Sequence, residues 1–403
     1  MTEELPATRN ESFSVLDKHV GNSKKVAVAF SGGKDSTALA LFLLDWIMER
    51  GRSDISVTLV HSDTLSEIPE MEMWSRKFME AYRDLARSMG VRADFIVTKP
   101  VPIDTFYWRV LIRGYVAPTF SFRWCVELLK RMPSREALKR VGSALVLLGH
   151  RDEESSARAA SLARRGMMCP LTAGRCSSYY FNVEGNSIRI YPIRSWTATQ
   201  VWDYLRDWRK KIDLDDLFKL YMDGAMPARY GCWHCTLVKR QLGHYILGDN
   251  HMYFEAARLL YRWISDLPWM RIPKDRGYSK LGPLTPTARA IIAKLILTAE
   301  KLSGIKLYGL DESKLEDYTL RQILFEIPEN EANKIIRKVE AIHIKKDPQR
   351  FVDIESIRDM GRYREQVLKF MEYVNGKHRS KKERMKLEEL EEYINTMTDN
   401  LLE

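Results

Sequence analysis

The chain has 403 residues, 45% of them hydrophobic, and a formal net charge of +10 at pH 7. This length allows two domains with ordinary buried cores, and the positive charge favours polyanionic partners. The longest apolar run, ALALFLLDWIM, is interrupted by Asp45 and is too short to cross a bilayer. The first twelve residues, MTEELPATRNES, lack a signal-peptide pattern. We therefore expect a cytoplasmic protein with no membrane partner.

Four apolar runs that are typical of strands occur in the first 150 residues. They are VAVAF (26–30), ISVTLVHSD (55–63), RADFIVTK (92–99) and SALVLLGH (143–150). Helical patterns separate these runs, among them the one from Glu70 to Met89. Strands that alternate with helices predict an α/β fold with a mainly parallel, twisted sheet and helices on both faces. In such a fold ligands bind at the carboxyl ends of the strands.

The pattern changes near residue 246, where long helical segments begin and no further strand-like run follows. We therefore expect an α/β domain over residues 1–245, which contains all five cysteines, and a helical C-terminal domain over residues 246–403. Within the latter, KHRSKKERMK (377–386) has six basic residues in ten. Such a segment can contact nucleic-acid phosphates, and a solvated helix face has the same composition.

The segment FSGGKDST (30–37) follows the first strand-like run and precedes a helical pattern. Glycines allow a tight turn with accessible N–H groups, hydroxyls add donors, a lysine adds positive charge, and an aspartate can bind Mg²⁺ or pair with a cation. The loop residues are Ser31, Gly32, Gly33, Lys34, Asp35, Ser36 and Thr37. The spacing differs from a P-loop, because Val28 stands at the outer glycine position and Asp35 follows the lysine.

SGGKDS resembles the signature of the PP-loop ATP pyrophosphatase superfamily. The resemblance implies an adenine nucleotide alpha-hydrolase-like fold, in which residues 31–37 hold the triphosphate of ATP with Mg²⁺. It also implies that Lys34 and Asp35 act in catalysis, and that the products are an adenylated substrate and pyrophosphate. The alternative is an ordinary glycine-rich turn between a strand and a helix, which requires neither the lysine nor the aspartate.

Polar motifs also follow two other predicted strands. HSDTLSE (61–67) resembles the acidic segment that lines the adenosine site of related enzymes, which implies that Asp63 lies near the nucleoside; a strand end with a helix cap is the alternative. GHRDEESSAR (149–158) resembles the family segment G-x-R-x-x-E-S-x-x-R. We expect Arg151 and Arg158 to stabilise charge on the transferring group, since guanidinium groups bind phosphate oxygens in pairs. Ion pairs on a surface helix would use the same residue types.

Five cysteines are too few for a disulfide scaffold in a chain of this length. Cys232 and Cys235 form a CxxC turn, whose spacing lets two thiolates bind one metal centre, and Cys125 can supply a third. RWCVELLK (123–130) and GCWHCTLVK (231–239) resemble segments of PP-loop enzymes that carry a [4Fe-4S] cluster. The resemblance therefore implies an iron-sulfur cluster held by these three cysteines.

Two alternatives to the cluster remain open. One is a structural zinc site completed by Cys176, His234 or His244, and the other is a redox-active CxxC dithiol. The fourth cluster ligand is also open, because Cys169, Cys176 or neither can supply it.

The sequence resembles the phosphoadenosine phosphosulfate reductase-like branch of the superfamily over about residues 20–245, and YPIRSWTATQVWDYL (191–205) contributes to this similarity. A reductase of that branch uses a catalytic cysteine near its C-terminus, but no cysteine follows Cys235 here. RYGCWHCT and GPLT (282–285) resemble the sulfur-transfer protein of DNA phosphorothioation systems.

This last resemblance implies an ATP-dependent sulfurtransferase that adenylates a nucleic acid, DNA or tRNA, and then inserts sulfur by way of the cluster. A sulfur-donor protein such as a cysteine desulfurase is the partner it implies. One alternative is a reductase that forms sulfite from phosphoadenosine or adenosine phosphosulfate. Another is a nucleotide-binding iron-sulfur module without catalysis.

Overall fold

The computed structural model describes residues 4–101, 104–142, 145–154, 180–184, 187–225, 230–273, 281–307, 360–376 and 388–402. The chain forms two compact units. The first contains Met1–Asp63, Pro69–Lys99 and Lys130–Arg229, and the second contains Thr64–Ile68, Pro100–Leu129 and Tyr230–Glu403. The division into domains at residues 245 and 246 is a different partition of the chain and stays a prediction.

A six-stranded sheet forms the centre of the first unit, with strand order β3-β2-β1-β4-β6-β5. All neighbouring strands run parallel except β5, which is antiparallel to β6. The strands are β1 (Lys25–Phe30), β2 (Ser56–Ser62), β3 (Arg92–Thr98), β4 (Leu145–Leu148), β5 (Phe181–Glu184) and β6 (Ser187–Ile190). The first four match the predicted apolar runs, and the predicted mainly parallel sheet is confirmed.

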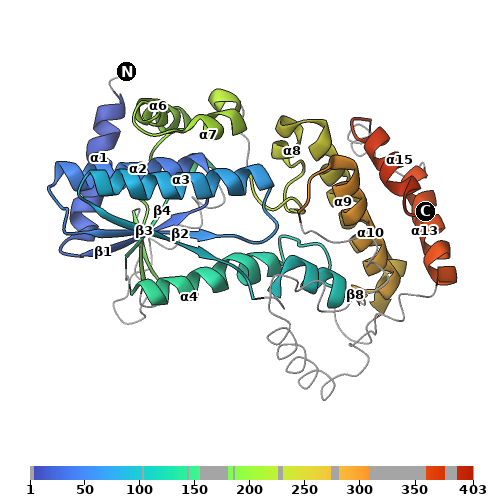
Figure 1. Cartoon of the computed structure of the whole chain (residues 1–403). Helices are drawn as coiled ribbons and strands as arrows, with labels where there is room; N and C mark the ends of the chain where they lie inside the picture. The colour runs from blue at the N-terminus through green and yellow to red at the C-terminus, as the bar shows by residue number, and fades with distance from the viewer. Residues whose placement is uncertain are drawn as a thin grey trace, which may run out of the picture. The chain divides into compact units, whose positions relative to one another are not determined.

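Helices cover both faces of this sheet, with α2 and α3 on one face and α4 on the other (Figure 1). The helices of the first unit are α1 (Glu4–Val20), α2 (Lys34–Glu49), α3 (Pro69–Ser88), α4 (Met132–Val141), α6 (Ala198–Trp208) and α7 (Asp215–Leu220), with short 3₁₀ turns at Asp152–Glu154 and Met222–Gly224. Helix α2 packs against both β1 and α6, and twelve of its sixteen residues are buried. Its position is therefore tightly determined, and so is the position of its N-terminus.

The described part of the second unit is mainly helical. It contains π-helical turns at Trp108–Ile112 and, across the boundary between the units, Val126–Arg131, followed by α8 (Leu242–Leu247), α9 (Asp249–Asp266), a 3₁₀ turn at Pro268–Met270, α10 (Pro286–Ser303), α13 (Met360–Asn375) and α15 (Glu391–Asp399). Thr285 caps the N-terminus of α10, since its side chain accepts a hydrogen bond from the Ala288 N–H group. The basic segment 377–386 lies outside the described residues.

The expectation that no strand follows residue 246 is wrong. Strands β7 (Arg271–Pro273) and β8 (Leu281–Leu284) form an antiparallel pair. They have only three and four residues and each contains a proline, so no alternating apolar pattern marks them in the sequence. Among the described helices, none is long and apolar enough to span a bilayer.

Candidate functional site

The loop between β1 and α2 is held in a compact turn by its own hydroxyl groups. Ser36 Oγ donates to Gly33 O at 2.9 Å, and Thr37 Oγ1 donates to the same oxygen at 3.1 Å. The N–H group of Ser31 donates to Ser36 Oγ at 3.2 Å. Helix α2 follows Gly33 without a side-chain cap. The amides of its first turn can therefore bind an anion, and the helix dipole favours negative charge there.

Two positions next to this turn require glycine. Gly32 has φ +75°, and a Cβ atom on it would lie 1.9 Å from Ser75 Oγ of α3. Trp74 Nε1 of the same helix donates to Gly32 O at 2.8 Å, so α3 directly supports the loop. Gly149 follows β4, where a Cβ atom would lie 2.9 Å from Asp35 O. The ends of β1 and β4 thus approach each other more closely than side chains would permit.

A buried ion pair joins these two strand ends. Arg151 Nε donates to Asp35 Oδ1 at 2.6 Å, and Lys34 Nζ lies 2.7 Å from Asp35 Oδ2. Burial opposes ionisation of Asp35, but the positive charges of Lys34 and Arg151 outweigh this effect and lower its pKa below the usual value. Both carboxylate oxygens therefore already have cationic partners. In this arrangement Asp35 orients Lys34 and Arg151.

Arg151 also contacts the segment that leads into α6. Its Nη1 donates to Glu153 Oε2 at 2.7 Å and to Trp196 O at 3.1 Å, and Glu153 Oε2 accepts from the Ala198 N–H group at 2.6 Å. The motif G-x-R-x-x-E-S-x-x-R leaves the position of Glu153 unspecified, so the sequence reasoning missed it. Only the position of Glu153, two residues after Arg151, could have indicated this contact from the sequence. Arg158, predicted to act with Arg151, lies outside the described residues.

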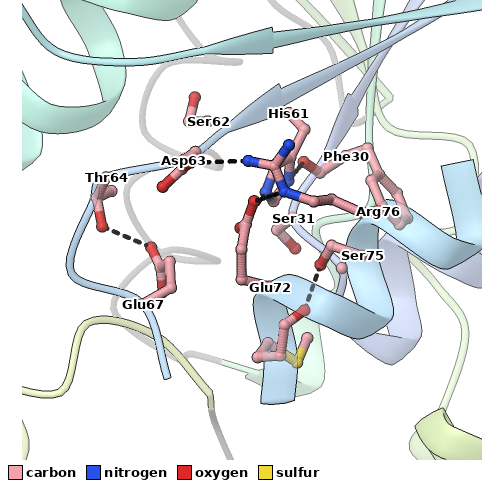
Figure 2. Close-up of polar contacts among 12 residues, drawn as sticks. Phe30, Ser31, His61, Ser62, Asp63, Thr64, Glu67, Glu72, Ser75 and Arg76 are labelled. Carbon is pink, nitrogen blue, oxygen red and sulfur yellow. Dashed lines mark hydrogen bonds and ion pairs between the residues drawn. The ribbon is translucent and has the colours of Figure 1, made fainter. Parts of the chain in front are cut away.

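Asp63 directly follows β2, at the same edge of the sheet as the loop after β1. This residue is 6% exposed, and Asp63 Oδ2 accepts from Arg76 Nη2 at 3.0 Å (Figure 2). Lys99 Nζ lies 3.9 Å from the same oxygen. The structure thus places the predicted nucleoside-binding aspartate beside the candidate phosphate loop, with its carboxylate held by two cations.

A series of charged contacts continues from Asp63 through Arg76 and Glu72 to His61, and the sequence did not predict it. Arg76 Nε lies 2.8 Å from Glu72 Oε1, and Glu72 Oε2 lies 2.9 Å from His61 Nε2 (Figure 2). His61 Nδ1 is 3.1 Å from Phe30 O, an atom that can only accept, so this contact favours the tautomer with the proton on Nδ1. Burial raises the pKa of Glu72, but His61 and Arg76 lower it further and keep this carboxyl ionised.

The second unit contains the CxxC turn, which pairs with the segment that follows Asp63. Glu67 and Cys232 form an antiparallel bridge, and the Trp233 N–H group donates to Ser66 O at 2.9 Å. Cys232 Sγ lies 3.4 Å from Thr64 Oγ1 and 3.7 Å from Glu67 Oε1. The segment HSDTLSE is therefore divided between the two units. Its first three residues belong to the nucleotide-binding unit and its last four to the cysteine unit.

A buried arginine of α9 holds the chain directly after the CxxC turn. Arg258 Nη1 donates to Cys235 O at 3.1 Å and Val238 O at 3.2 Å, and Nη2 donates to Lys239 O at 3.2 Å. Nε and Nη2 also donate to the two oxygens of Glu255, at 2.8 and 2.5 Å. All five N–H groups of the guanidinium are thus used. Sequence reasoning missed this pair, since no motif includes it.

Two further side chains hold the cysteine turn itself. Gln241 Nε2 donates to Cys232 O at 3.2 Å, and His244 Nε2 lies 3.3 Å from Trp233 O. Burial lowers the pKa of His244 to about 3, so this histidine is neutral at physiological pH. Five carbonyl groups between residues 232 and 239 therefore have side-chain partners, although this segment forms neither helix nor sheet ladder.

The donor set for a metal centre is present in the second unit, but the described residues do not form a closed site. Cys125, Cys232 and Cys235 are all half-buried members of this unit. Thiolates suit an iron-sulfur cluster or zinc. Across the described ranges, no three His, Cys, Asp or Glu side chains converge into a group that could hold a metal ion. The two candidate fourth ligands, Cys169 and Cys176, lie outside those ranges.

The parallel sheet with a glycine-rich loop before a buried helix defines an α/β nucleotide-binding class of protein. Residues 25–238, more than half of the chain, match the model of the phosphoadenosine phosphosulfate reductase domain, and the chain belongs to this family. Its members are nucleotide-binding enzymes. The predicted reductase-like branch of the PP-loop superfamily is thereby confirmed.

Individual relatives are more distant. An uncharacterized protein of Methanocaldococcus jannaschii is 26% identical over 308 residues, 74% of this chain, and the chain spans 62% of that relative's length. Sulfate adenylyltransferase subunit 2 of Streptomyces lavendulae is 24% identical over 65% of this chain and 76% of its own. The crystal structure of phosphoadenylyl-sulfate reductase from Candida auris superposes with a TM-score of 0.35 at 20% identity, and it covers 59% of this chain and 98% of its own.

The buried pair of Asp35 and Arg151 generates a first prediction. Asp35→Ala removes one of the two carboxylates that compensate the Arg151 charge, so we expect a loss of about 3 kcal/mol in the free energy of unfolding. Urea denaturation followed by tryptophan fluorescence measures this loss. Lys77→Met is the control, because its pair with Asp216 is exposed and should contribute less than about 1 kcal/mol. Equal effects of the two substitutions would contradict the assignment.

A second prediction concerns Arg258. Arg258→Met leaves the buried Glu255 charge and three carbonyl groups without their donors, so we expect a loss of about 3 to 5 kcal/mol. Arg262→Met, at an exposed position of the same helix, should change stability by no more than about 0.5 kcal/mol. The double variant Arg258→Met/Glu255→Leu should recover part of the loss, because it removes both charges. No recovery would show that the ion pair is not the cause.

Proposed function

We propose that the protein is an ATP-dependent sulfurtransferase that adenylates an oxygen atom of a nucleic acid and replaces this oxygen by sulfur. The observation that carries the proposal is the loop after β1, whose helix N-terminus has no side-chain cap and whose lysine lies beside it. In this proposal the triphosphate and Mg²⁺ bind at residues 31–37, and Asp63 lies near the nucleoside. The similarity to sulfate adenylyltransferase subunit 2 supports adenylation of an oxyanion.

The proposed reaction has two displacements. The acceptor oxygen attacks the α-phosphorus of ATP, a new phosphorus–oxygen bond forms, and the bond to pyrophosphate breaks. Hydrosulfide, which a thiol reductant releases from the persulfide of a donor protein such as a cysteine desulfurase, then attacks the activated atom, a bond to sulfur forms, and AMP leaves with the original oxygen. Activation is needed because an oxygen without AMP is a poor leaving group.

The charged residues of the first unit have distinct parts in this scheme. Lys34 lies against Asp35 in the structure, and we propose that it turns to the β- and γ-phosphates when ATP binds. Arg151 is only 4% exposed and bonded to Asp35, Glu153 and Trp196, which supports a role in positioning the loop and adding positive charge near the transferring group. Arg158 is proposed to supply the second guanidinium.

Cys125, Cys232 and Cys235 are proposed to hold a [4Fe-4S] cluster, with Cys169, Cys176 or no cysteine as the fourth ligand. When bound, such a cluster supplies a soft site for sulfur. The support is the presence of all three thiols in one compact unit and the bonds that hold the CxxC turn. The net charge of +10 supports a nucleic-acid acceptor, DNA or tRNA.

Reduction of a sulfonucleotide is the second candidate, because the matching family model is named for that reaction. A thermal-shift comparison with magnesium-ATP, adenosine phosphosulfate and phosphoadenosine phosphosulfate separates the two. A ligand at a hundred times its dissociation constant stabilises by about 2.7 kcal/mol. We expect a selective shift with ATP. A selective shift with either sulfonucleotide would replace the proposal by the reductase.

The role of Lys34 gives a third prediction. Lys34→Ala should abolish both the ATP shift and pyrophosphate release in the presence of acceptor, because the variant lacks the cation of the loop. Lys24→Ala removes an exposed lysine before β1 and should retain both properties. Normal pyrophosphate release by Lys34→Ala would be incompatible with ATP activation at this loop.

A fourth prediction concerns the cysteines. Iron and acid-labile sulfide, measured on protein purified without oxygen, should be present in the wild type and lost in Cys125→Ser, Cys232→Ser and Cys235→Ser. The same measurement on Cys169→Ser and Cys176→Ser identifies a fourth ligand. Stoichiometric zinc in place of iron would establish the structural zinc site, and full iron content in the three variants would refute their assignment.

A further inference from the structure

An exposed aromatic turn precedes Cys125 in the second unit. Phe120 is 73% exposed and Phe122 is 46% exposed, whereas most large apolar side chains of this unit are buried. The N–H group of Thr119 donates to Phe122 O at 3.3 Å, and the N–H group of Phe122 donates to Thr119 O at 3.1 Å. The turn is therefore closed by two backbone hydrogen bonds, and it presents two aromatic rings to solvent. Such a surface is typical of a recognition site.

Guanidinium groups accompany these rings. The Arg123 guanidinium lies 5.0 Å from the centroid of the Phe120 ring. Arg123 is exposed, and within the described part of the chain it forms no ion pair. The Phe122 ring lies 6.1 Å from that of Tyr115, which in turn has the Arg109 guanidinium 5.1 Å from its centroid. The Arg109 guanidinium pairs with the Asp104 carboxylate, whereas Arg123 can attract a phosphate beside bases that stack on the exposed rings.

Several contacts fix this turn beside the cysteine-bearing segments. Pro118 O, directly before the turn, accepts from Thr236 Oγ1 at 2.6 Å, and Thr236 follows Cys235 in the chain. The Ala117 N–H group donates to Ser265 Oγ at 3.0 Å. Arg123 is separated from Cys125 by a single residue, the buried Trp124. The exposed rings are thus presented by a segment that is anchored next to two of the three described cysteines.

We infer that Phe120, Phe122 and Arg123 form a stacking platform for an unpaired nucleobase. The inference rests on the proposed function in so far as the acceptor is a nucleic acid. Every nucleobase has a flat π face, so two exposed phenyl rings can bind a base in any sequence context, and Arg123 adds attraction for the phosphate beside it. An apolar protein partner would gain from the phenyl rings but would leave the Arg123 charge uncompensated.

The test measures binding of fluorescein-labelled single-stranded DNA and RNA of about 12 nucleotides, a length within the range that one nucleic-acid-binding domain covers. Fluorescence anisotropy at fixed salt compares the wild type with leucine and tryptophan variants. Phe120→Leu and Phe122→Leu keep an apolar side chain but remove the π face, and should weaken binding about tenfold each. Phe120→Trp should bind within about twofold of the wild type, because stacking is retained.

Two controls define the result. Tyr373→Leu changes another exposed aromatic residue of the second unit and should leave the affinity unchanged. A blunt duplex of the same sequence, whose bases are paired, should bind with the same affinity to the wild type and to Phe120→Leu. Loss of binding in both the leucine and the tryptophan variants, or equal binding by Phe120→Leu and the wild type, would overturn the platform. So would a wild type that does not bind either oligonucleotide.

The outcome is separable from that of the proposed function. A selective thermal shift with magnesium-ATP, together with an oligonucleotide affinity that is the same in Phe120→Leu and the wild type, would overturn only the platform. Binding that depends on stacking, in a protein whose thermal shift is selective for a sulfonucleotide, would support the platform and overturn the sulfurtransferase.

Discussion

The buried ion pair between Asp35 and Arg151 is the constraint on which the candidate nucleotide site depends. It joins the first turn of α2 to the residues after β4, two segments 116 positions apart in the chain. Either charge alone in this place would be costly, so each residue requires the other. Gly149 permits the approach, because any side chain there would collide with Asp35 O. The orientation of the N-terminus of α2, and with it the anion-binding loop, follows from this junction.

In the second unit, a buried ion pair of α9 holds the segment that follows the CxxC turn. The chain after Cys232 forms no regular structure that could bind its carbonyl groups, and buried carbonyl groups without donors are destabilising. A single guanidinium, that of Arg258, supplies three of the missing bonds, and the Glu255 carboxylate neutralises its charge. Thiols that bind a metal or carry sulfur need a fixed backbone, since small displacements change their mutual distances. The ion pair of α9 provides that rigidity.

In the proposed reaction, nucleotide activation uses residues of the first unit and sulfur chemistry uses the cysteines of the second. Family membership establishes the nucleotide-binding class of enzyme. In the proposed scheme, the positive net charge and the exposed phenyl rings of the second unit fit a large polyanionic acceptor.

The parallel sheet, the four central strands and the loop after β1 could be predicted from the sequence. Each has a local signal, either an apolar run that ends in polar residues or two glycines before a helical pattern. The short strands β7 and β8 have no such signal, because three or four residues are too few to show a period.

The partners of the charged residues were decided only by the tertiary structure. Nothing local distinguishes Glu153, Glu72 or Arg258 from the other charged residues of the chain, because a charge can pair with many partners and its actual partner depends on which segments the fold brings together. Asp63 and Thr64 illustrate the limit most clearly. The sequence places both in one motif, and the fold gives one to the nucleotide-binding unit and the other to the unit of the cysteines.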